Sequence, residues 1–172
     1  AKAYMIYQVG ALQAFCDSYG VTLQHMKLHG AFYNTACVTP KLADAVLDGL
    51  QAINPNIAAM VLSGSYIAKE AERRGIPVIQ EVFADRGYTD EGTLVPRTEP
   101  GAFIKDPQEA LERVLMMVTE GKVVTNTGNT IDIVADSVCV HGDNPEAIAF
   151  TNYIREGLTK AGVTVANFQN RK

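Results

Sequence analysis

The residues with the most reactive side chains gather in the segment "HMKLHGAFYN" at 25–34. Residues 21–28 follow the pattern of a β-strand, and the alternation of side chains along a strand places His25, Lys27 and His29 on one face. Imidazole and ammonium groups transfer protons and bind anions. This face is directed either to solvent or into a functional site, and the other strands decide between the two.

Two further predicted strands, 76–83 and 136–141, also collect polar side chains at the carboxyl end of one face. These side chains are Glu81, Asp85, His141 and Asp143. Ligands of parallel α/β folds bind outside the carboxyl ends of the strands. We therefore expect the three groups to converge on one site.

Each of these residues also has a purely structural interpretation. A single histidine near a strand end is most often a satisfied hydrogen-bonding group, and His25, deeper in its strand, fits that role best. Glu81 could pair with an arginine such as Arg86, and Asp143 before Asn144-Pro145 suits a helix N-cap. The combined pattern of three strands is stronger evidence than any single member.

The elements that must position these residues alternate between helix and strand patterns. Helices are predicted at 4–19, 39–53, 66–74, 106–120 and 145–161. Strands are predicted at 21–28, 57–62, 76–83 and 136–141, with a hairpin at 122–134 and a last strand at 163–168. This order indicates an α/β fold with a parallel sheet.

A long segment without regular structure is predicted between about residues 84 and 104, which we call the 84–104 loop. Its length, about 20 residues, exceeds what compact domains usually tolerate without a reason. The loop is either an active-site lid or a solvated excursion that makes a subunit contact.

Composition excludes several classes of protein. The net charge is −4 and no Lys/Arg run stands out, so neither nucleic acid nor an anionic membrane is expected as a partner. No apolar run approaches the roughly 20 residues of a membrane span. The three scattered cysteines form no CxxC pair, which favours core thiols in a reducing cytoplasm over a zinc finger or a disulfide scaffold.

Motif absences narrow the chemistry further. The chain has no G-x-x-x-x-G-K-[ST], no G-x-G-x-x-G, no G-x-S-x-G and no H-E-x-x-H. The histidines of "HMKLH" are four residues apart, which on a strand separates them by roughly 13 Å. They cannot chelate one metal ion together in that form.

Four segments together resemble the LamB/YcsF (lactam-utilisation) family over about Tyr7 to Val165. They are "YQVGALQAF", "HMKLHGAFYN", "EVFADRGYTDEGTLVPRTEPGAFI" and "DSVCVHGDNPEAI". The resemblance implies an irregular (β/α) barrel of the glycoside hydrolase/deacetylase type. Family members begin with a further segment bearing "DLNCDLGE"-like and "GFHAGD"-like strand ends, which this chain lacks. We therefore expect residues 1–172 to form a single domain, the C-terminal two-thirds of such a barrel without its N-terminal strands.

The resemblance also implies a reaction, because characterised bacterial members are the A-subunit of ATP-dependent 5-oxoprolinase. The expected activity is hydrolysis of 5-oxo-L-proline to L-glutamate coupled to ATP hydrolysis, with two companion subunits that resemble allophanate hydrolase components. Mg²⁺ or another divalent metal, and a homo-oligomer, are left open. The alternatives are an ATP-independent, metal-dependent amidase or deacetylase, and a non-catalytic subunit that presents substrate or serves as a scaffold.

The family motifs carry the candidate site residues. Those expected to act in catalysis are Lys27, His29, Glu81, His141 and Asp143, and those expected to bind substrate are Tyr33, Asn34, Asp85, Arg86 and Arg97. Lys27, with Arg86 or Arg97, would neutralise a carboxylate or phosphate. His141 or Asp143 would orient or deprotonate water. Glu81 would supply a second carboxylate for acid–base or Mg²⁺ chemistry, and His29 would donate to a developing oxyanion.

Overall fold

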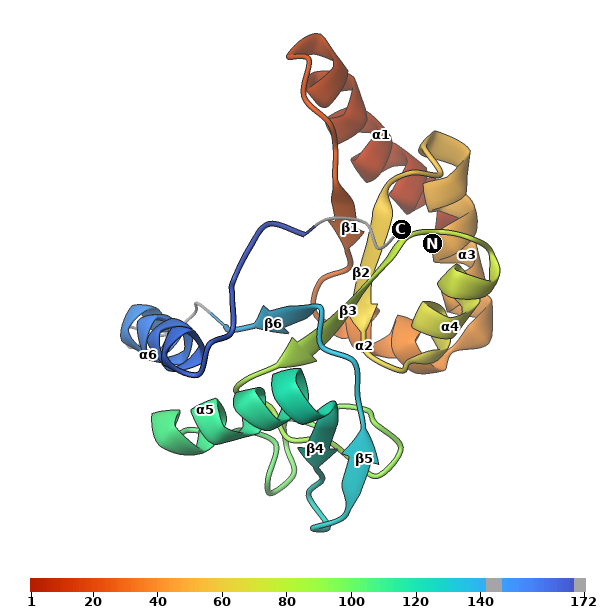
Figure 1. The fold of residues 1–172 in the computed structure, drawn as a ribbon. Coiled ribbons are helices and arrows are strands. Elements are labelled where there is room, and N and C mark those ends of the chain that lie inside the picture. The colour runs from red at the N-terminus through yellow and green to blue at the C-terminus, as the bar shows by residue number, and fades with distance from the viewer. Residues whose placement is uncertain (142–146, 169–172) are drawn as a thin grey trace. The chain divides into compact units, whose positions relative to one another are not determined.

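The computed structural model describes residues 1–141 and 147–168 of the chain. It contains helices and mostly parallel strands in alternation, as an α/β fold requires (Figure 1). The chain divides into two compact units, Ala1–Gln80 and Glu81–Lys172. Strand β3 (Val78–Phe83) contributes residues to both units.

The first unit is built from helices packed around two parallel strands. Its elements are α1 (Lys2–Ser18), β1 (His25–Lys27), α2 (Ala31–Val38), α3 (Pro40–Ile53), β2 (Ala58–Leu62) and α4 (Tyr66–Arg73). β1 pairs in parallel with β2, with Lys27 opposite Met60. The amide of Ala59 donates to the carbonyl of Pro77 at 2.8 Å, so the chain leading into β3 runs beside β2.

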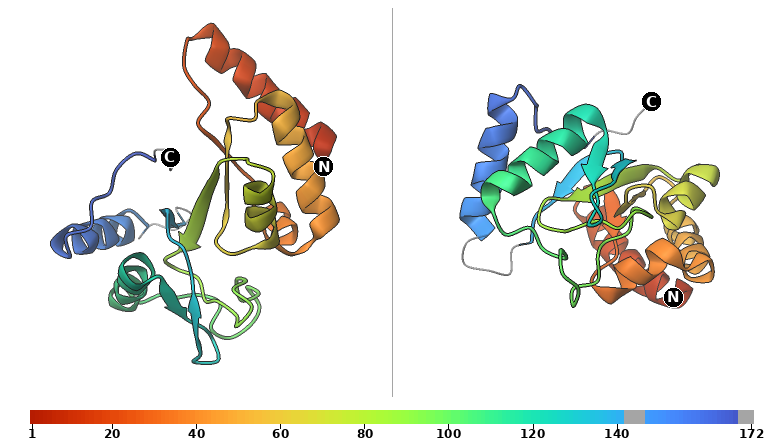
Figure 2. Two further views of the ribbon diagram at one scale, coloured as in Figure 1. Left: turned by 45° about the vertical axis from the view of Figure 1, so that its right-hand side comes forward. Right: turned by 90° about the horizontal axis from the view of Figure 1, so that it is seen from below.

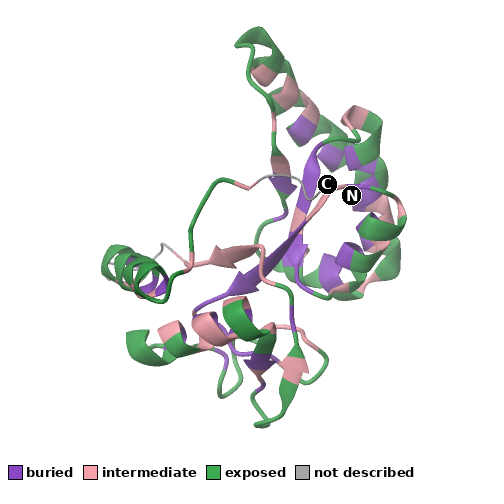
Figure 3. Ribbon diagram, in the orientation of Figure 1, coloured by how far each residue is buried: buried purple, intermediate pink, exposed green. Residues whose placement is uncertain are grey.

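Helix α1 lies along α3, and two of the three views show the pair clearly (Figures 1 and 2). The two helices approach closely at Gly49 of α3, where an added Cβ atom would lie 2.6 Å from Cβ of Met5. Met5 and Val9 are the buried residues of α1, and most of the helix is exposed (Figure 3). The missing side chain of Gly49 is therefore what lets the two helices approach.

Charged groups fasten α4 to α3. The guanidinium of Arg74, which follows α4, donates to Asp44 at 2.7 Å, to Asp48 at 2.8 Å and to Glu70 at 2.6 Å. Hydrogen bonds from Arg73 and Arg74 lower the pKa of Glu70 to about 2. Arg74 thus joins α3 to the end of α4 through charge-assisted hydrogen bonds.

The second unit continues from the end of β3. Its further elements are α5 (Pro107–Leu115), a π-helical turn (Met116–Glu120), β4 (Lys122–Val124), β5 (Thr130–Asp132), β6 (Ser137–Cys139) and α6 (Ala147–Lys160). β3 pairs in parallel with β6, and β4 pairs antiparallel with β5 as the predicted hairpin. α5 begins at Asp106, whose carboxylate accepts from the amides of Gln108 and Glu109.

The structure corrects three elements of the sequence analysis. Residues 31–38 form helix α2. No helix was predicted there, because the residue before it is Gly30, with φ of 60°, and no side chain caps the helix. The strand predicted at 21–28 is regular only over His25–Lys27. The strand predicted at 163–168 is wrong, since those residues have no strand structure.

Candidate functional site

The register of β3 against β6 brings an acid and a histidine together. Phe83 pairs with Cys139, and Asp85 and His141 each lie two residues further along their own chains. Nδ1–H of His141 therefore donates to Oδ2 of Asp85 at 2.6 Å. We call these two residues the acid–histidine pair.

The surroundings hold this pair in one orientation. The Phe83 ring stacks on the imidazole, with centroids 5.7 Å apart and an interplanar angle of 26°. The Asp85 side chain is 19% exposed and that of His141 is 28% exposed. Because Nδ1 carries the shared proton, Nε2 of His141 is left as the acceptor that can take a proton from water.

The other carboxylate oxygen of Asp85, Oδ1, is buried and has no hydrogen-bond partner among the described residues. A buried acceptor without a partner costs roughly 1–3 kcal/mol. Proteins retain such a cost mainly where a ligand, water or ion completes the bond. The atom therefore supports a functional interpretation of the acid–histidine pair.

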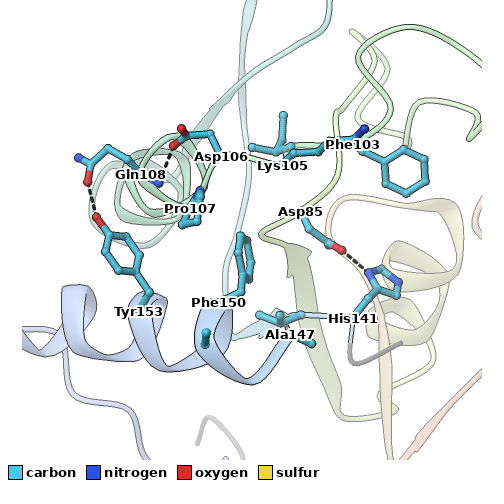
Figure 4. Close-up of a pocket in the computed structure, with 13 residues that line it drawn as sticks. Asp85, Phe103, Lys105, Asp106, Pro107, Gln108, His141, Ala147, Phe150 and Tyr153 are labelled. Carbon is cyan, nitrogen blue, oxygen red and sulfur yellow. Dashed lines mark hydrogen bonds and ion pairs between the residues drawn. The ribbon is translucent and has the colours of Figure 1, made fainter. Parts of the chain in front are cut away.

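A cavity of about 810 Å³ opens beside the pair and lies wholly within the second unit. Figure 4 shows Asp85, His141 and Phe103 at one end, and Tyr153 with Gln108 at the other. The Tyr153 hydroxyl donates to Oε1 of Gln108, which fixes that far end. The volume lies within the range of about 300–1,000 Å³ that is typical of ligand pockets.

The 84–104 loop, confirmed as a segment without helix or strand, is held by a buried cation. The Arg86 side chain is 2% exposed, and it donates from Nε to the carbonyl of Ala102 at 2.9 Å and from Nη2 to that of Val95 at 2.6 Å. Burial lowers the pKa of Arg86, and the positive charge of Arg97 lowers it further. Arg86 thus joins three parts of the loop.

Two more contacts order the loop. The amide of Phe83 donates to the hydroxyl of the fully buried Tyr88 at 2.9 Å. Asp90 accepts hydrogen bonds from Thr125 and Thr127 at Oδ1 and from Asn129 at Oδ2, which attaches the loop to the β4–β5 turn. These hydrogen bonds lower the pKa of Asp90. The loop is therefore a built wall of the second unit.

Several candidate residues belong to the first unit. The Lys27 ammonium lies 5.7 Å from the ring centroid of Tyr33, a buried residue of α2. His29 and Asn34 are exposed. His25 contacts Gln24 through Nδ1 at 3.1 Å, as its structural interpretation suggests.

Three candidate residues remain, of which the structure describes two. Glu81 is 2% exposed on β3, Arg97 is exposed in the loop, and Asp143 lies outside the described residues. The structure brings Asp85 to His141 and Lys27 to Tyr33. Convergence of all the predicted residues on one site stays a prediction.

Sequence reasoning missed several residues that shape the second unit's cavity. Phe103, Gln108 and Tyr153 were not singled out, because an aromatic or amide side chain in a loop or on a helix carries no local signal for a cavity. Phe83 was detectable, since strand alternation places it on the same face as Glu81 and Asp85.

Two groups that the resemblance left open, a divalent metal ion and ATP, would each need a particular set of residues. No group of three or more His, Cys, Asp or Glu side chains within 1–141 and 147–168 is placed to hold a metal ion. Asp85 and His141 supply two possible metal ligands, which is fewer than a zinc or calcium ion usually takes from a protein. No glycine-rich phosphate loop is present in the sequence.

These elements define an α/β protein whose parallel strands end in an acid–histidine pair beside an arginine-bearing loop. The model of the LamB/YcsF family matches residues 1–172, and the chain belongs to that family. No helix in the described part of the chain is long and apolar enough to cross a membrane.

Proteins named as the A-subunit of 5-oxoprolinase are similar to this chain over almost its whole length. The A-subunit of 5-oxoprolinase from Fusobacterium nucleatum is 58% identical over 165 residues, which are 96% of this chain and 64% of the relative. The protein of the same name from Pyrococcus abyssi is 47% identical, over 96% of this chain and 65% of its own. The chain thus spans a little under two-thirds of their length.

A solved structure shares the fold. The crystal structure of the lactam utilization protein from Thermus thermophilus matches with a TM-score of 0.87 and 40% sequence identity. The match covers 97% of this chain and 66% of that one. The α/β arrangement of parallel strands is therefore that of a known member of the same group.

Proposed function

We propose that this chain acts in a 5-oxoprolinase that hydrolyses 5-oxo-L-proline to L-glutamate. The observation that carries the proposal is the 58% identity, over 96% of this chain, to the A-subunit of 5-oxoprolinase from Fusobacterium nucleatum. The four segments that resemble the family, which carry all the candidate residues, are present in this chain.

The acid–histidine pair supports the proposal chemically. Opening a lactam requires water to attack the ring carbonyl carbon and the ring nitrogen to leave as an amine. With its Nδ1 proton held by Asp85, His141 accepts the proton of the attacking water at Nε2 and returns it to the leaving nitrogen. Asp85 keeps the imidazole oriented and stabilises the imidazolium that forms between the two transfers.

Coupling to ATP is part of the proposal because the reaction is difficult without it. An amide nitrogen is a poor leaving group, and the unstrained five-membered ring closes back readily. Phosphorylation of the lactam carbonyl oxygen would make the carbonyl carbon a good electrophile. The chain offers no known phosphate loop, so we assign the ATP site to companion subunits, which the naming of the relatives as one lettered subunit of an enzyme supports.

The finer description of the fold belongs to the same proposal. We infer that the parallel strands form part of an irregular (β/α) barrel of the glycoside hydrolase/deacetylase type. In such a barrel the carboxyl ends of the strands share one mouth, and the candidate residues at strand ends are predicted to form a shared site there. Alanine substitution of Lys27, His29 and Asp143 tests that shared site.

The test is 5-oxoproline-dependent release of glutamate by the complete protein with its companion subunits, with and without ATP. We expect turnover only with ATP, and a loss of about a hundredfold or more in kcat for His141→Gln. His25→Gln is the matched control, because His25 contacts only its neighbour Gln24 among the hydrogen bonds described above.

Other outcomes would replace the proposal. Turnover without ATP would indicate an amidase or deacetylase, and metal analysis would then identify its ion. Binding of 5-oxoproline without any turnover would indicate a substrate-presenting subunit. Unchanged kcat in His141→Gln would reject the acid–histidine pair as the catalytic group.

A further inference from the structure

Phe103 lies against two guanidinium groups at the edge of the cavity. Cζ of Arg86 is 5.1 Å from its ring centroid and Cζ of Arg97 is 5.6 Å from it. Both distances are within the roughly 6 Å at which a cation is attracted to an aromatic face. The ring is 43% exposed and lines the cavity at the end that holds Asp85 and His141 (Figure 4).

The two arginines differ in what their donors do. Arg86 is buried, and its Nε and Nη2 groups donate to loop carbonyls, so it anchors the backbone that carries Phe103. Arg97 is exposed, and no hydrogen bond or ion pair joins it to any residue within 1–141 and 147–168. Its contact with Phe103 leaves its N–H donors available.

Stacking on a ring suits a guanidinium that must receive an anion. A guanidinium that lies face-on against a ring keeps its N–H donors in its own plane, where they match the two oxygens of a carboxylate. A free arginine side chain also has many rotamers, and ordering it on binding opposes affinity. A ring that holds the guanidinium beforehand reduces that cost.

We infer that Phe103 is a positioning residue that holds Arg97 at the rim of the cavity, where Arg97 binds the carboxylate of a small cyclic amide. This inference rests on the proposed function for the identity of the ligand. It also separates the roles of the two arginines: Arg97 meets the ligand, while Arg86 supports the loop and the ring. Lys105 also lines the cavity and is the rival cation.

The experiment compares two ligands that differ only in the carboxylate, 5-oxo-L-proline and 2-pyrrolidinone. Their dissociation constants are measured on the complete protein for wild type, Arg97→Ala, Phe103→Ala, Phe103→Tyr and Lys105→Gln. Where the wild type turns over 5-oxoproline, KM and kcat are measured for the same variants. Phe103→Tyr keeps the ring and serves as the rescue variant.

We expect Arg97→Ala to weaken 5-oxoproline binding by about tenfold to a hundredfold, the size of a charge-assisted hydrogen bond, with 2-pyrrolidinone unaffected. Phe103→Ala should weaken it by about threefold to fivefold, the size of an exposed cation–π contact, and Phe103→Tyr should restore it. In turnover, Phe103→Ala should raise KM and leave kcat near the wild-type value.

Three results would overturn the inference. Phe103→Ala could leave the preference for the ligand with the carboxylate intact. It could also weaken the binding of both ligands equally, as the loss of a merely structural residue would. Lys105→Gln could abolish the preference in place of Arg97→Ala. Failure of the proposed function is a distinct result, since a wild type that prefers 5-oxoproline without hydrolysing it rejects the reaction and retains the roles of Phe103 and Arg97.

Discussion

Replacing Gly87 by alanine should lower the free energy of unfolding, because two backbone segments of the 84–104 loop meet at Gly87. An added Cβ atom at Gly87 would lie 2.0 Å from the carbonyl oxygen of Gly101 and 3.1 Å from its carbon. Cβ contacts below 3.0 Å essentially do not occur, so the two segments must separate by about 1 Å. The obstacle is backbone and cannot rotate away as a side chain would.

The magnitude follows from what that separation disturbs. Forcing extra atoms into packed structure costs about 1–3 kcal/mol. Two hydrogen bonds are put at risk, from the Gly87 amide to Ala102 at 3.1 Å and from the Val95 amide to Gly87 at 3.0 Å. Each is worth about 0.5–1.5 kcal/mol, so the free energy of unfolding should fall by about 2–6 kcal/mol.

Urea and thermal unfolding of the complete protein measure this loss. For a chain of this size, each kcal/mol lowers Tm by about 2–4 °C, so a drop of at least about 4 °C is expected. Gly10→Ala is the matched control, because no heavy atom lies within 4 Å of a Cβ added in the middle of α1. The control should be unchanged or stabilised by up to about 1 kcal/mol.

A Gly87→Ala protein with the unfolding midpoint of the wild type would refute this reasoning. It would mean that the loop yields by about 1 Å without cost, and that the contacts of Arg86 and Tyr88 do not fix its path. The same result would remove the basis for treating the loop as a built wall.

Three further substitutions test other parts of the structure. Asp85→Asn should lower kcat by about a hundredfold or more with the fold intact, because the amide no longer stabilises a positive His141; near-normal kcat with normal circular dichroism would contradict this. Asp90→Asn should lower the unfolding midpoint at pH 7, because the folded state depresses the pKa of Asp90 below its ordinary value of 3.8. The stabilisation by the Asp90 carboxylate is complete above that ordinary value and is lost as pH falls through the folded value, so the midpoints of wild type and variant should approach each other as the solution is acidified. Gly49→Ala should cost about 1–3 kcal/mol in urea unfolding, because its Cβ atom would press on Met5; an unchanged midpoint would show that α1 shifts freely on α3.

Local signals in the sequence were sufficient for most helices. Thr39-Pro40 and Asp106-Pro107 are local start signals for α3 and α5. The Asp106 side chain caps its helix, whereas that of Thr39 makes no capping hydrogen bond. Helix α2 was missed because Gly30 begins it and no side chain caps it, so the usual start signal is absent. Its burial of Tyr33, Ala36 and Cys37 is a tertiary effect that a single segment does not reveal.

The site was predictable only in part, for a similar reason. Alternation along the strands placed Asp85 and His141 at strand ends, where the structure has them. Their direct hydrogen bond depends on the pairing of Phe83 with Cys139, a register that no local pattern encodes. Arg86 was predicted to bind substrate. Its hydrogen bonds to the carbonyls of Ala102 and Val95 could not be predicted from the sequence, because a charged residue in a loop carries no signal for its backbone partners.

The buried guanidinium in the 84–104 loop has a consequence for protein engineering. Irregular segments are usually the first choice for inserting an epitope or a reporter domain, or for new chain ends in a circular permutant. Arg86 donates hydrogen bonds to Val95 and Ala102, which lie 9 and 16 positions further along the chain. A cut or insertion between Arg86 and Ala102 would therefore disturb these buried hydrogen bonds. The exposed turn at Pro55-Asn56, between α3 and β2, is the better place for such changes.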